Sequence, residues 1–423
     1  MKDYIQIIAD KINSGTPVVF YTVGGDTFSM IRLLKKRFNL KPVAVCDKDV
    51  EKQGRNYHAL DGIPVISFDE ANTRYPNAEY FISSMNYRFE IMAELINSKN
   101  LPIERIINYE PLKKRKSCTF FERSVFLKDN GDLIFCCVRN SPSMKYDECY
   151  DSYTKNFLKF RNEMISACEN GGLPDVCANC GYLKEAWYPE KPMSWWVNWF
   201  VRNICNYKCK YCKSPTHTMK DLQGLPEFGK TIEAFQNAGV LSDFYSVILS
   251  TSGEPTLSPK RKDFYDSFNG YALFVNTNGS NFDRDLFQLM QDKIVMLVVS
   301  IDAGTSETYK EIKGVDSFDK VIQNLQNYMQ ACVGYVVPKY IFMPGINDNE
   351  IDVDGFADIC DRLSVPYAII AYDQRGVNPI PDKTIQMMRR LQSNLENNNI
   401  LCVPYTPYET YEYVAALTNA LSS

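Results

Sequence analysis

Residues 203–212 read NICNYKCKYC and place three cysteines, Cys205, Cys209 and Cys212, within eight positions. The chain has 14 cysteines in 423 residues, so a fixed three-cysteine spacing arises by chance only about 0.015 times in a chain of this composition. A loop of this length can direct three thiolates at three irons of a four-iron cluster and leave the fourth iron open. A structural zinc site needs a fourth cysteine or histidine, and His217 keeps that alternative open.

The residues after this loop alternate between strand and helix patterns. Strands are predicted at 196–204, 245–250, 272–276, 294–301, 335–343 and 367–371, with a helix at 318–328, for example. Six such repeats predict a partial, open β/α barrel over residues 191–375, whose active site lies at the C-terminal ends of the strands. Residues 376–423 are predicted to be a helical extension with a strand-like piece at 400–403.

Short polar motifs stand at the ends of these predicted strands. The second strand is followed by TSGEP (251–255) and the third by NTNG (276–279), the fourth ends in SID (300–302), and the fifth is followed by PGIND (344–348). Each motif alone is a common turn sequence. Because the carboxyl ends of barrel strands meet at one face, their order along the chain predicts a single site.

The cysteine loop and these motifs together resemble the radical S-adenosylmethionine (SAM) superfamily, whose loop carries an aromatic residue, here Tyr211, before the third cysteine. The resemblance implies a [4Fe–4S] cluster on Cys205, Cys209 and Cys212 whose open iron chelates SAM. An electron from a reducing partner such as flavodoxin or ferredoxin then breaks the S–C5′ bond, and the resulting 5′-deoxyadenosyl radical takes a hydrogen atom from the substrate. The residues implied to contact SAM are Tyr211, Ser252, Gly253, Glu254, Asn276, Ser300 and Asp302, with Ser252 where the family has a glycine.

A second group of cysteines lies upstream, in residues 117–190. A hairpin is predicted at 123–137 with its turn at Asn130-Gly131, and the C-x(9–15)-G-x(4)-C arrangement resembles the first half of the SPASM and twitch auxiliary-cluster modules. The resemblance implies a second [4Fe–4S] cluster held by Cys118, Cys136, Cys177 and Cys180, with Cys137 as an alternative to Cys136. The module stands before the barrel instead of after it, and the second half of the full SPASM cysteine set is missing. An all-cysteine zinc site is the other interpretation.

Residues 1–112 predict a separate α/β domain with strands at 18–22, 42–46, 62–66 and 80–82 and a helix at 27–37. This alternation favours a parallel, doubly wound sheet, and it resembles the small Rossmann-like domains of bacterial sugar and polysaccharide biosynthesis proteins. Asp47 ends the second strand, where a dinucleotide-binding domain places its ribose carboxylate. Gly24-Gly25, however, is not a G-x-G-x-x-G fingerprint.

Composition restricts the class of protein. Hydrophobic residues make up 45% and charged residues 23%, and the net charge of −4 gives no basic excess for a nucleic-acid surface. No apolar run approaches the roughly 20 residues of a membrane helix, and no targeting signal is evident, so we expect a cytoplasmic protein without membrane partners. The basic run 113–116 (KKRK) is interpreted as a solvated linker, and Trp187, Tyr188, Trp195, Trp196 and Trp199 as packing between modules.

We therefore expect a radical SAM oxidoreductase that abstracts hydrogen from a small polar substrate, such as a sugar or nucleotide-sugar, for epimerisation, dehydration or oxidation. A SPASM-type peptide or protein maturase is the first alternative, and a non-enzymatic iron–sulfur or zinc-binding protein is the second. Cys149 and Cys168 are expected to be unligated. Cys332, Cys360 and Cys402 are expected to act as small hydrophobic residues, although one of them donating a hydrogen atom to a substrate radical is an alternative.

Overall fold

The computed structural model describes residues 3–404 except 86, 128–130, 137–141, 147–148, 179, 202–203, 213–225, 252, 331–333 and 374–378. Cys137, His217, Ser252, Cys332 and Asn130 of the predicted hairpin turn lie outside the described residues. No helix among those described is long and apolar enough to cross a bilayer.

The N-terminal domain contains the predicted parallel sheet. Its strands β1 (Val18–Tyr21), β2 (Ala44–Cys46), β3 (Val65–Ile66) and β4 (Glu79–Ile82) lie in the order β3-β2-β1-β4. Its helices are α1 (Tyr4–Asn13), α2 (Gly25–Phe38), α3 (Phe68–Arg74) and α4 (Arg88–Asn97), with short 3₁₀ turns at His58–Leu60 and Ile103–Arg105. All three strand pairs are parallel, which confirms the predicted α/β alternation.

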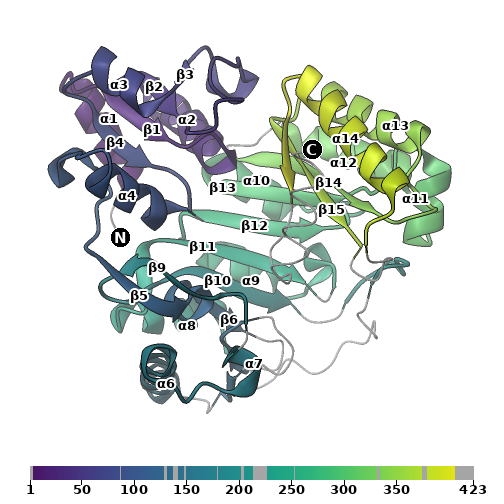
Figure 1. The fold of residues 1–423 in the computed structure, drawn as a ribbon. Coiled ribbons are helices and arrows are strands. Elements are labelled where there is room, and N and C mark those ends of the chain that lie inside the picture. Colours follow the sequence, from purple (N-terminus) through teal and green to yellow (C-terminus); the bar gives the residue numbers. More distant parts are fainter. Residues whose placement is uncertain are drawn as a thin grey trace.

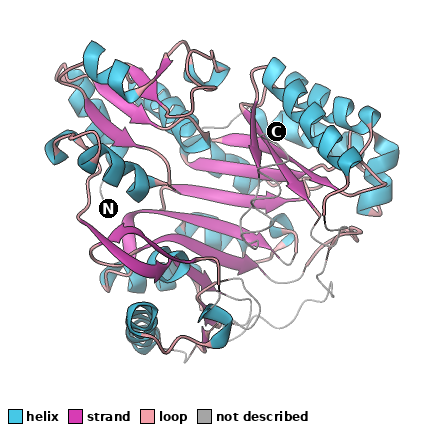
Figure 2. Cartoon of the chain, in the orientation of Figure 1, coloured by secondary structure: helices cyan, strands magenta, loops and turns pink. Residues whose placement is uncertain are grey.

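The barrel region is one long curved sheet with helices on its outer side (Figure 2). Its strands are β10 (Ser194–Val201), β11 (Leu241–Thr251), β12 (Ala272–Thr277), β13 (Ile294–Ser300), β14 (Tyr335–Phe342) and β15 (Tyr367–Tyr372), which pair in parallel in chain order. The six predicted strands are thereby confirmed. Two further parallel strands extend the sheet, β16 (Leu401–Pro404) beside β15 and β6 (Ser124–Leu127) beside β10.

Helices cover the outer face because each buries one apolar stripe against alternate residues of the strands. They are α8 (Phe228–Asn237), α9 (Arg261–Ser267), α10 (Arg284–Asp292), α11 (Ser306–Lys313), α12 (Phe318–Met329), α13 (Glu350–Arg362) and α14 (Asp382–Asn397), with a 3₁₀ turn at Pro255–Leu257. Leu273, Val275 and Leu297 pack in the same cluster as Leu286 and Val321 of these helices. Side-chain caps from Asp283, Thr305 and Asn349 start α10, α11 and α13.

The inner face of the sheet carries the alternate residues, and near the starts of the strands the N-terminal domain covers it. Ala272, Met296 and Val337 pack in one cluster with Phe28 and Ile31 of α2. The hydroxyl of Tyr335 also donates to the Phe28 carbonyl at 3.2 Å. Figure 1 shows this domain, in purple and blue, against the tail ends of the central strands. The strand ends that lead to the predicted site are at the opposite edge.

The cysteine-rich segment joins both parts. It contains β5 (Leu112–Cys118), α5 (Thr119–Arg123), β6, β7 (Leu133–Ile134), β8 (Ser143–Met144), α6 (Tyr150–Asn170), α7 (Asp175–Ala178) and β9 (Leu183–Pro189). The predicted hairpin is confirmed, since β6 and β7 pair antiparallel. Because β6 also pairs with β10, this segment continues the barrel sheet. The predicted boundaries 1–112, 117–190, 191–375 and 376–423 stay predictions.

The interpretation of residues 113–116 as a solvated linker was wrong. These residues belong to β5, which pairs antiparallel with β9 along seven residues. Arg115 is buried, and its guanidinium donates two hydrogen bonds to the carboxylate of Glu122, at 2.8 and 2.7 Å. A run of four basic residues gives no sign in the sequence that one of them has a buried carboxylate partner seven positions later.

Aromatic residues pack where the three parts meet, as expected from the sequence. Trp195 at the start of β10 is buried, and the ring of Phe89 meets its edge at a centroid distance of 5.3 Å. The guanidinium of Arg88 lies over the same indole at 4.3 Å and forms an ion pair with Glu110 at 3.5 Å. Residues of α4 therefore fasten the N-terminal domain to the first barrel strand.

Candidate functional site

The cysteine loop follows β10 at the open edge of the sheet. Cys205 and Cys209 are half-buried and Cys212 is exposed, and the amide of Cys212 donates to the Cys209 carbonyl at 3.0 Å. Burial raises the pKa of the Cys205 and Cys209 thiols. Cysteine ligands bind metal as thiolates, so a bound cluster has to displace these protons.

Two neighbouring elements hold this loop in place. The amide of Lys210 donates to the Ile312 carbonyl at 2.9 Å, and that of Lys208 donates to the Lys313 carbonyl at 3.4 Å. These are final carbonyls of α11, which have no partner within their own helix. On the other side, the buried hydroxyl of Tyr207 bonds that of Ser317 at 2.5 Å. The α11–α12 region therefore fixes the loop on both sides of its second cysteine, Cys209.

Glu254, expected to contact SAM, joins two of the predicted motifs to each other. Its buried carboxylate accepts hydrogen bonds from the hydroxyls of Thr256 (2.7 Å) and Thr277 (2.6 Å) and from the amide of Asn278 (2.7 Å). Burial raises the pKa of this carboxyl, and the hydrogen bonds oppose that shift. Its carboxylate therefore has protein partners at both oxygens and aligns the loops after β11 and β12.

The NTNG loop reaches the cysteines directly. The side-chain amide of Asn278 lies 4.0 Å from the Cys205 sulfur and donates to the side-chain oxygen of Asn206 at 2.8 Å. Asn206 in turn donates to the Ser280 hydroxyl at 2.9 Å. The first cysteine is thus tied to the strand end two positions away in the sheet, as the order of motifs predicted.

A buried ion pair joins the second motif group to the loop. Asp302 and Lys313 are both fully buried, with 2.5 Å between Oδ2 and Nζ. Lys313 also donates to the hydroxyl of Tyr211 at 2.8 Å, and that hydroxyl donates to Asp302 at 2.9 Å. Ser300 lies close enough to Tyr211 to lower the pKa of its hydroxyl, against the larger effect of burial. Three predicted residues, Tyr211, Ser300 and Asp302, are therefore brought together around a lysine that the sequence analysis did not identify.

The PGIND turn supports Asp302 from behind. Asn347 is fully buried, and its amide donates to the carbonyls of Asp302 and Ile341, both at 2.8 Å. The amide of Ile341 donates to the other carboxylate oxygen of Asp302 at 2.8 Å. Asp302 has a φ of +60°, a left-handed conformation in which aspartate is tolerated. Each carboxylate oxygen therefore has a protein partner.

Polar residues occupy the inner face near the strand ends. Alternation with Ala272, Met296 and Val337 places Asn276, Ser300 and Lys339 on that face, and all three are half-buried. Ser300 and Lys339 pair across β13 and β14. The inner face thus changes from apolar at the N-terminal domain to polar at the open edge.

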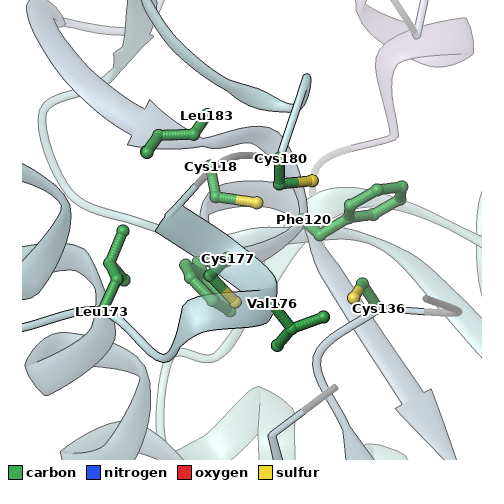
Figure 3. A pocket seen from close by; sticks show the side chains of 9 residues that line it. Cys118, Phe120, Cys136, Leu173, Val176, Cys177, Cys180 and Leu183 are labelled. Atoms are coloured by element: carbon green, nitrogen blue, oxygen red, sulfur yellow. The ribbon is translucent and has the colours of Figure 1, made fainter. Parts of the chain in front are cut away.

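The four upstream cysteines border one pocket. Cys118, Cys136, Cys177 and Cys180 line it together with Phe120, Phe121, Leu173, Val176 and Leu183. Figure 3 shows the four sulfurs directed toward a common space. Four thiols without histidine suit an iron–sulfur cluster or zinc. Burial raises the pKa of Cys118 to about 12 and that of Cys177 to about 11, so both thiols are protonated at neutral pH without metal.

The thiols of both groups stand apart in this structure. Among the residues described, no three His, Cys, Asp or Glu side chains are close enough together to hold a metal ion as they stand. Donor type and enclosure fit a cluster in both places, and coordination requires the side chains to close toward each other. Cys168 of α6 is buried and lies close enough to the upstream cysteines to raise the pKa of Cys177.

Cys360 and Cys402 are placed away from the inner face. Cys360 is buried among the outer helices, and Cys402 packs against the same outer cluster. Neither position faces the side of the sheet that carries Asn276 and Ser300, so the structure does not favour either cysteine as a hydrogen donor to a substrate there.

The corresponding edge of the N-terminal sheet is filled by protein. A Cβ atom on Gly25, at the start of α2, would lie 2.8 Å from the hydroxyl of Tyr367 in β15. Asp47 is buried and accepts hydrogen bonds from the amides of Val23 (2.9 Å) and Asp49 (3.0 Å). A bound dinucleotide would need the space beside Gly25 for its phosphates and the Asp47 carboxylate for its ribose. The ribose-binding interpretation of Asp47 is therefore not favoured.

Comparison with known proteins agrees with the motif pattern. Residues 199–355 match the radical SAM superfamily. GTP 3′,8-cyclase of Haemophilus influenzae (strain PittEE) is 26% identical over 175 residues, which are 39% of this chain and 50% of the relative. The same enzyme of Cronobacter sakazakii (strain ATCC BAA-894) is 27% identical over 164 residues, 36% and 47% of the two chains. The chain thus spans about half the length of the curated relatives that it matches.

Among solved structures, SuiB of Streptococcus suis bound to precursor peptide SuiA is similar at 13% identity, over 69% of this chain and 73% of that chain, with a TM-score of 0.41. A radical SAM methyltransferase of Sphaerobacter thermophilus is similar at 16% identity, over 49% and 64%, with a TM-score of 0.35.

Proposed function

Because residues 199–355 form a radical SAM domain, we propose that this chain is an enzyme that removes a hydrogen atom from a small-molecule or peptide substrate. Radical SAM domains use a [4Fe–4S] cluster and SAM, and reductive cleavage of SAM supplies a 5′-deoxyadenosyl radical. The observation that carries the proposal is the arrangement of Cys205, Cys209 and Cys212 on one loop, fixed at the open edge of the sheet by α11 and Asn278.

Each group of residues has a separate task in this proposal. The three cysteines hold the cluster, and the polar inner face at Asn276 and Ser300 binds and orients the polar parts of SAM. Glu254 aligns the loops that border it, since its carboxylate bonds Thr277 and Asn278. A reducing protein such as flavodoxin or ferredoxin supplies the electron.

A small polar substrate such as a sugar is the first candidate class. Its support is the half-buried Lys339 beside Ser300 on the inner face, where a cation and hydroxyl can bind hydroxyl, carboxylate or phosphate groups. The N-terminal domain gives no support for a nucleotide portion, because Tyr367 occupies the space beside Gly25. Substrate recognition is therefore assigned to the barrel.

A peptide substrate is the second candidate class, and the four-thiol pocket supports it, since SPASM-like modules are typical of peptide maturases. The pocket would hold a second cluster through Cys118, Cys136, Cys177 and Cys180. Continuing the β6–β7 register places Cys136 opposite Ser124, which pairs with Trp196. Trp196 lies five positions before Val201, the end of β10, roughly 16 Å along the strand. This spacing favours an electron-transfer or structural role for the second cluster over direct contact with substrate at the SAM site.

The first experiment measures clusters and SAM cleavage. Anaerobic reconstitution of the full chain is expected to bind about eight irons per chain, and the triple variant Cys205→Ala/Cys209→Ala/Cys212→Ala about four, because each cubane holds four irons. The triple variant is expected to form no 5′-deoxyadenosine with SAM and dithionite. Cys149→Ser, an exposed cysteine outside the pocket, is the matched control. Formation of 5′-deoxyadenosine by the triple variant would refute the proposed function.

The second experiment separates the substrate classes. Wild-type enzyme is incubated with deuterated sugars or sugar phosphates in one series and with deuterated synthetic peptides in another. Deuterium transfer to 5′-deoxyadenosine is the readout. Transfer from the sugars supports the first class, and transfer from peptides alone replaces it with the second. Lys339→Met is expected to raise KM for an anionic sugar more than for a neutral one.

A further inference from the structure

Lys313 is the last residue of α11, and its side chain is only 1% exposed. Burial of a lysine is unusual unless its charge is paired. Its ammonium bonds both Asp302 and Tyr211, at 2.5 and 2.8 Å, and lies 5.0 Å from the centre of the Tyr211 ring. Lys310, one turn earlier on α11, is exposed and pairs with Asp316 at the surface. Lys310 is therefore an ordinary surface residue of the helix. Lys313 differs from it, because its side chain is buried and bonds residues of the candidate site.

The backbone of Lys313 contacts the cysteine loop as well. Its carbonyl accepts from Lys208, and the preceding carbonyl accepts from Lys210, on either side of Cys209. Gly314, with a φ of +72°, ends the helix, and a Cβ there would lie 3.4 Å from the Lys208 carbonyl oxygen. Side chain and backbone of one residue therefore hold the loop at two places, at Tyr211 and at the residues that flank Cys209.

The two members of the ion pair place opposite charges beside the cysteine loop. Both bond the hydroxyl of Tyr211, the residue before Cys212, and the Lys313 carbonyl accepts from the amide of Lys208, the residue before Cys209. Positive charge stabilises added negative charge in a site that excludes water. The reduction potential of an iron–sulfur cluster depends on nearby charge, hydrogen bonds and solvent exposure in the same way.

We propose that Lys313 is a positioning residue that fixes the Cys209–Cys212 segment and stabilises the reduced, more negative state of the cluster through its buried charge. The proposal rests on the cluster assigned above to Cys205, Cys209 and Cys212. Asp302 restrains the lysine and partly offsets its charge, while Tyr211 joins the pair to the loop. In this arrangement the residue next to the third cysteine cannot move without breaking a buried hydrogen bond.

The test compares variants of the full chain, loaded anaerobically. The reduction potential is taken from a redox titration of the electron-paramagnetic-resonance signal that changes on adding SAM, which separates this cluster from the upstream one. Lys313→Met is expected to shift the potential to more negative values and Asp302→Asn to less negative values. Lys313→Arg retains the charge and is expected to restore the wild-type potential. Lys310→Met is the matched control, with unchanged potential and iron content.

Opposite shifts distinguish a charge effect from structural damage, because damage to the loop would move both variants in one direction. Shifts of the same sign, or no shift in either, overturn the proposal. If Lys313→Met does not accumulate as folded protein, Asp302→Asn and Lys313→Arg decide: the first has to shift to less negative potential, and the second has to match wild type. A wild-type chain that binds no SAM-responsive cluster would refute the proposed function, which is a different outcome.

Discussion

Among the described residues, the four-stranded N-terminal sheet and the parallel strands of the barrel sheet differ in what lies against their carboxyl edges. In the barrel, the loops after β10, β11 and β12 meet one another through Asn278, Glu254 and Asn206, and they surround thiols. In the N-terminal sheet, the loop after β1 meets Tyr367 of the barrel instead, and Asp47 accepts hydrogen bonds from the loop after β1 and from its own loop after β2. Parallel strands followed by loops and helices form a carboxyl edge of the kind that binds ligands in both sheets. In the N-terminal sheet this edge is covered by the barrel, whereas in the barrel it carries the cysteine loop. The N-terminal domain uses its edge for docking.

Removing the clamp between the domains has the largest expected effect. Arg88→Met deletes the ion pair to Glu110 and the cation over Trp195, and breaking a buried pair costs about 3–5 kcal/mol. We expect loss of docking before loss of the barrel, seen as an early unfolding step in the tryptophan fluorescence, to which the buried Trp195 contributes. The surface variant Arg74→Met, whose ion pair to Glu70 is exposed, is expected to change stability by less than about 0.5 kcal/mol. A single unchanged transition in Arg88→Met would contradict the clamp.

The docked edge also contains a buried carboxyl whose protonation matters. Burial raises the pKa of Asp26 from 3.8 to about 6, against one hydrogen bond from the Met85 amide. The native state binds this proton more tightly than the unfolded chain, so stability present below about pH 4 is lost as the pH rises through 6. Asp26→Asn keeps the acceptor for Met85 and removes the charge. We expect it to be more stable than wild type by up to about 3 kcal/mol near neutral pH.

This gain is expected to disappear as the pH falls below about 4, which denaturant titrations across pH can follow. Asp61→Asn is a suitable control because Asp61 is exposed and paired with Lys35. A constant difference between Asp26→Asn and wild type at every pH would show that the carboxyl is not buried in a docked edge. Tyr271 and Tyr367 are the titratable neighbours that feel its charge.

The smallest expected effect comes from filling the space at Gly25. Gly25→Ala puts a methyl group against the Tyr367 hydroxyl, and overpacking of this kind costs about 1–3 kcal/mol. Gly24→Ala has open space around the added carbon and is the matched control. Tyr367→Ala is expected to remove most of the difference between the two glycine variants in a double-mutant cycle. Equal stabilities of Gly25→Ala and Gly24→Ala would indicate that the edge is open.

The sequence allowed the strands, the cysteine loop and the motif order to be predicted, because each depends on local periodicity or on spacing that chance seldom produces. It did not allow Lys313 to be found, since nothing in the end of a helix distinguishes a lysine paired with a buried aspartate from one at the surface. The contact of Gly25 with Tyr367 was missed for the same reason: both residues are ordinary in their own segments, and only tertiary packing joins them.

The basic run at 113–116 illustrates this limit most directly. Three of its members are exposed, as a polar stretch suggests, while Arg115 is buried against Glu122. Likewise, the SAM contacts expected at Glu254 and Asp302 follow the family's motif positions, yet Glu254 bonds Thr277 at the end of β12, and Asp302 bonds Lys313 of α11 and Tyr211 of the cysteine loop. The motif positions predicted where these residues lie. Their hydrogen-bond partners could be identified only from the folded structure.

The pairing of β6 with β10 has a consequence for how this protein can evolve and assemble. β10 is hydrogen-bonded on both sides, to β11 and to β6. A barrel that began at residue 191 would expose one side of a strand carrying Trp196, Val197 and Trp199, and such an apolar free edge is a template for aggregation. The cysteine-rich segment therefore protects this edge of the barrel, because its strand β6 forms the hydrogen bonds that β10 would otherwise leave unpaired. Its loss in a descendant would require a substitute strand or a charged, shortened β10, whether or not any metal were bound.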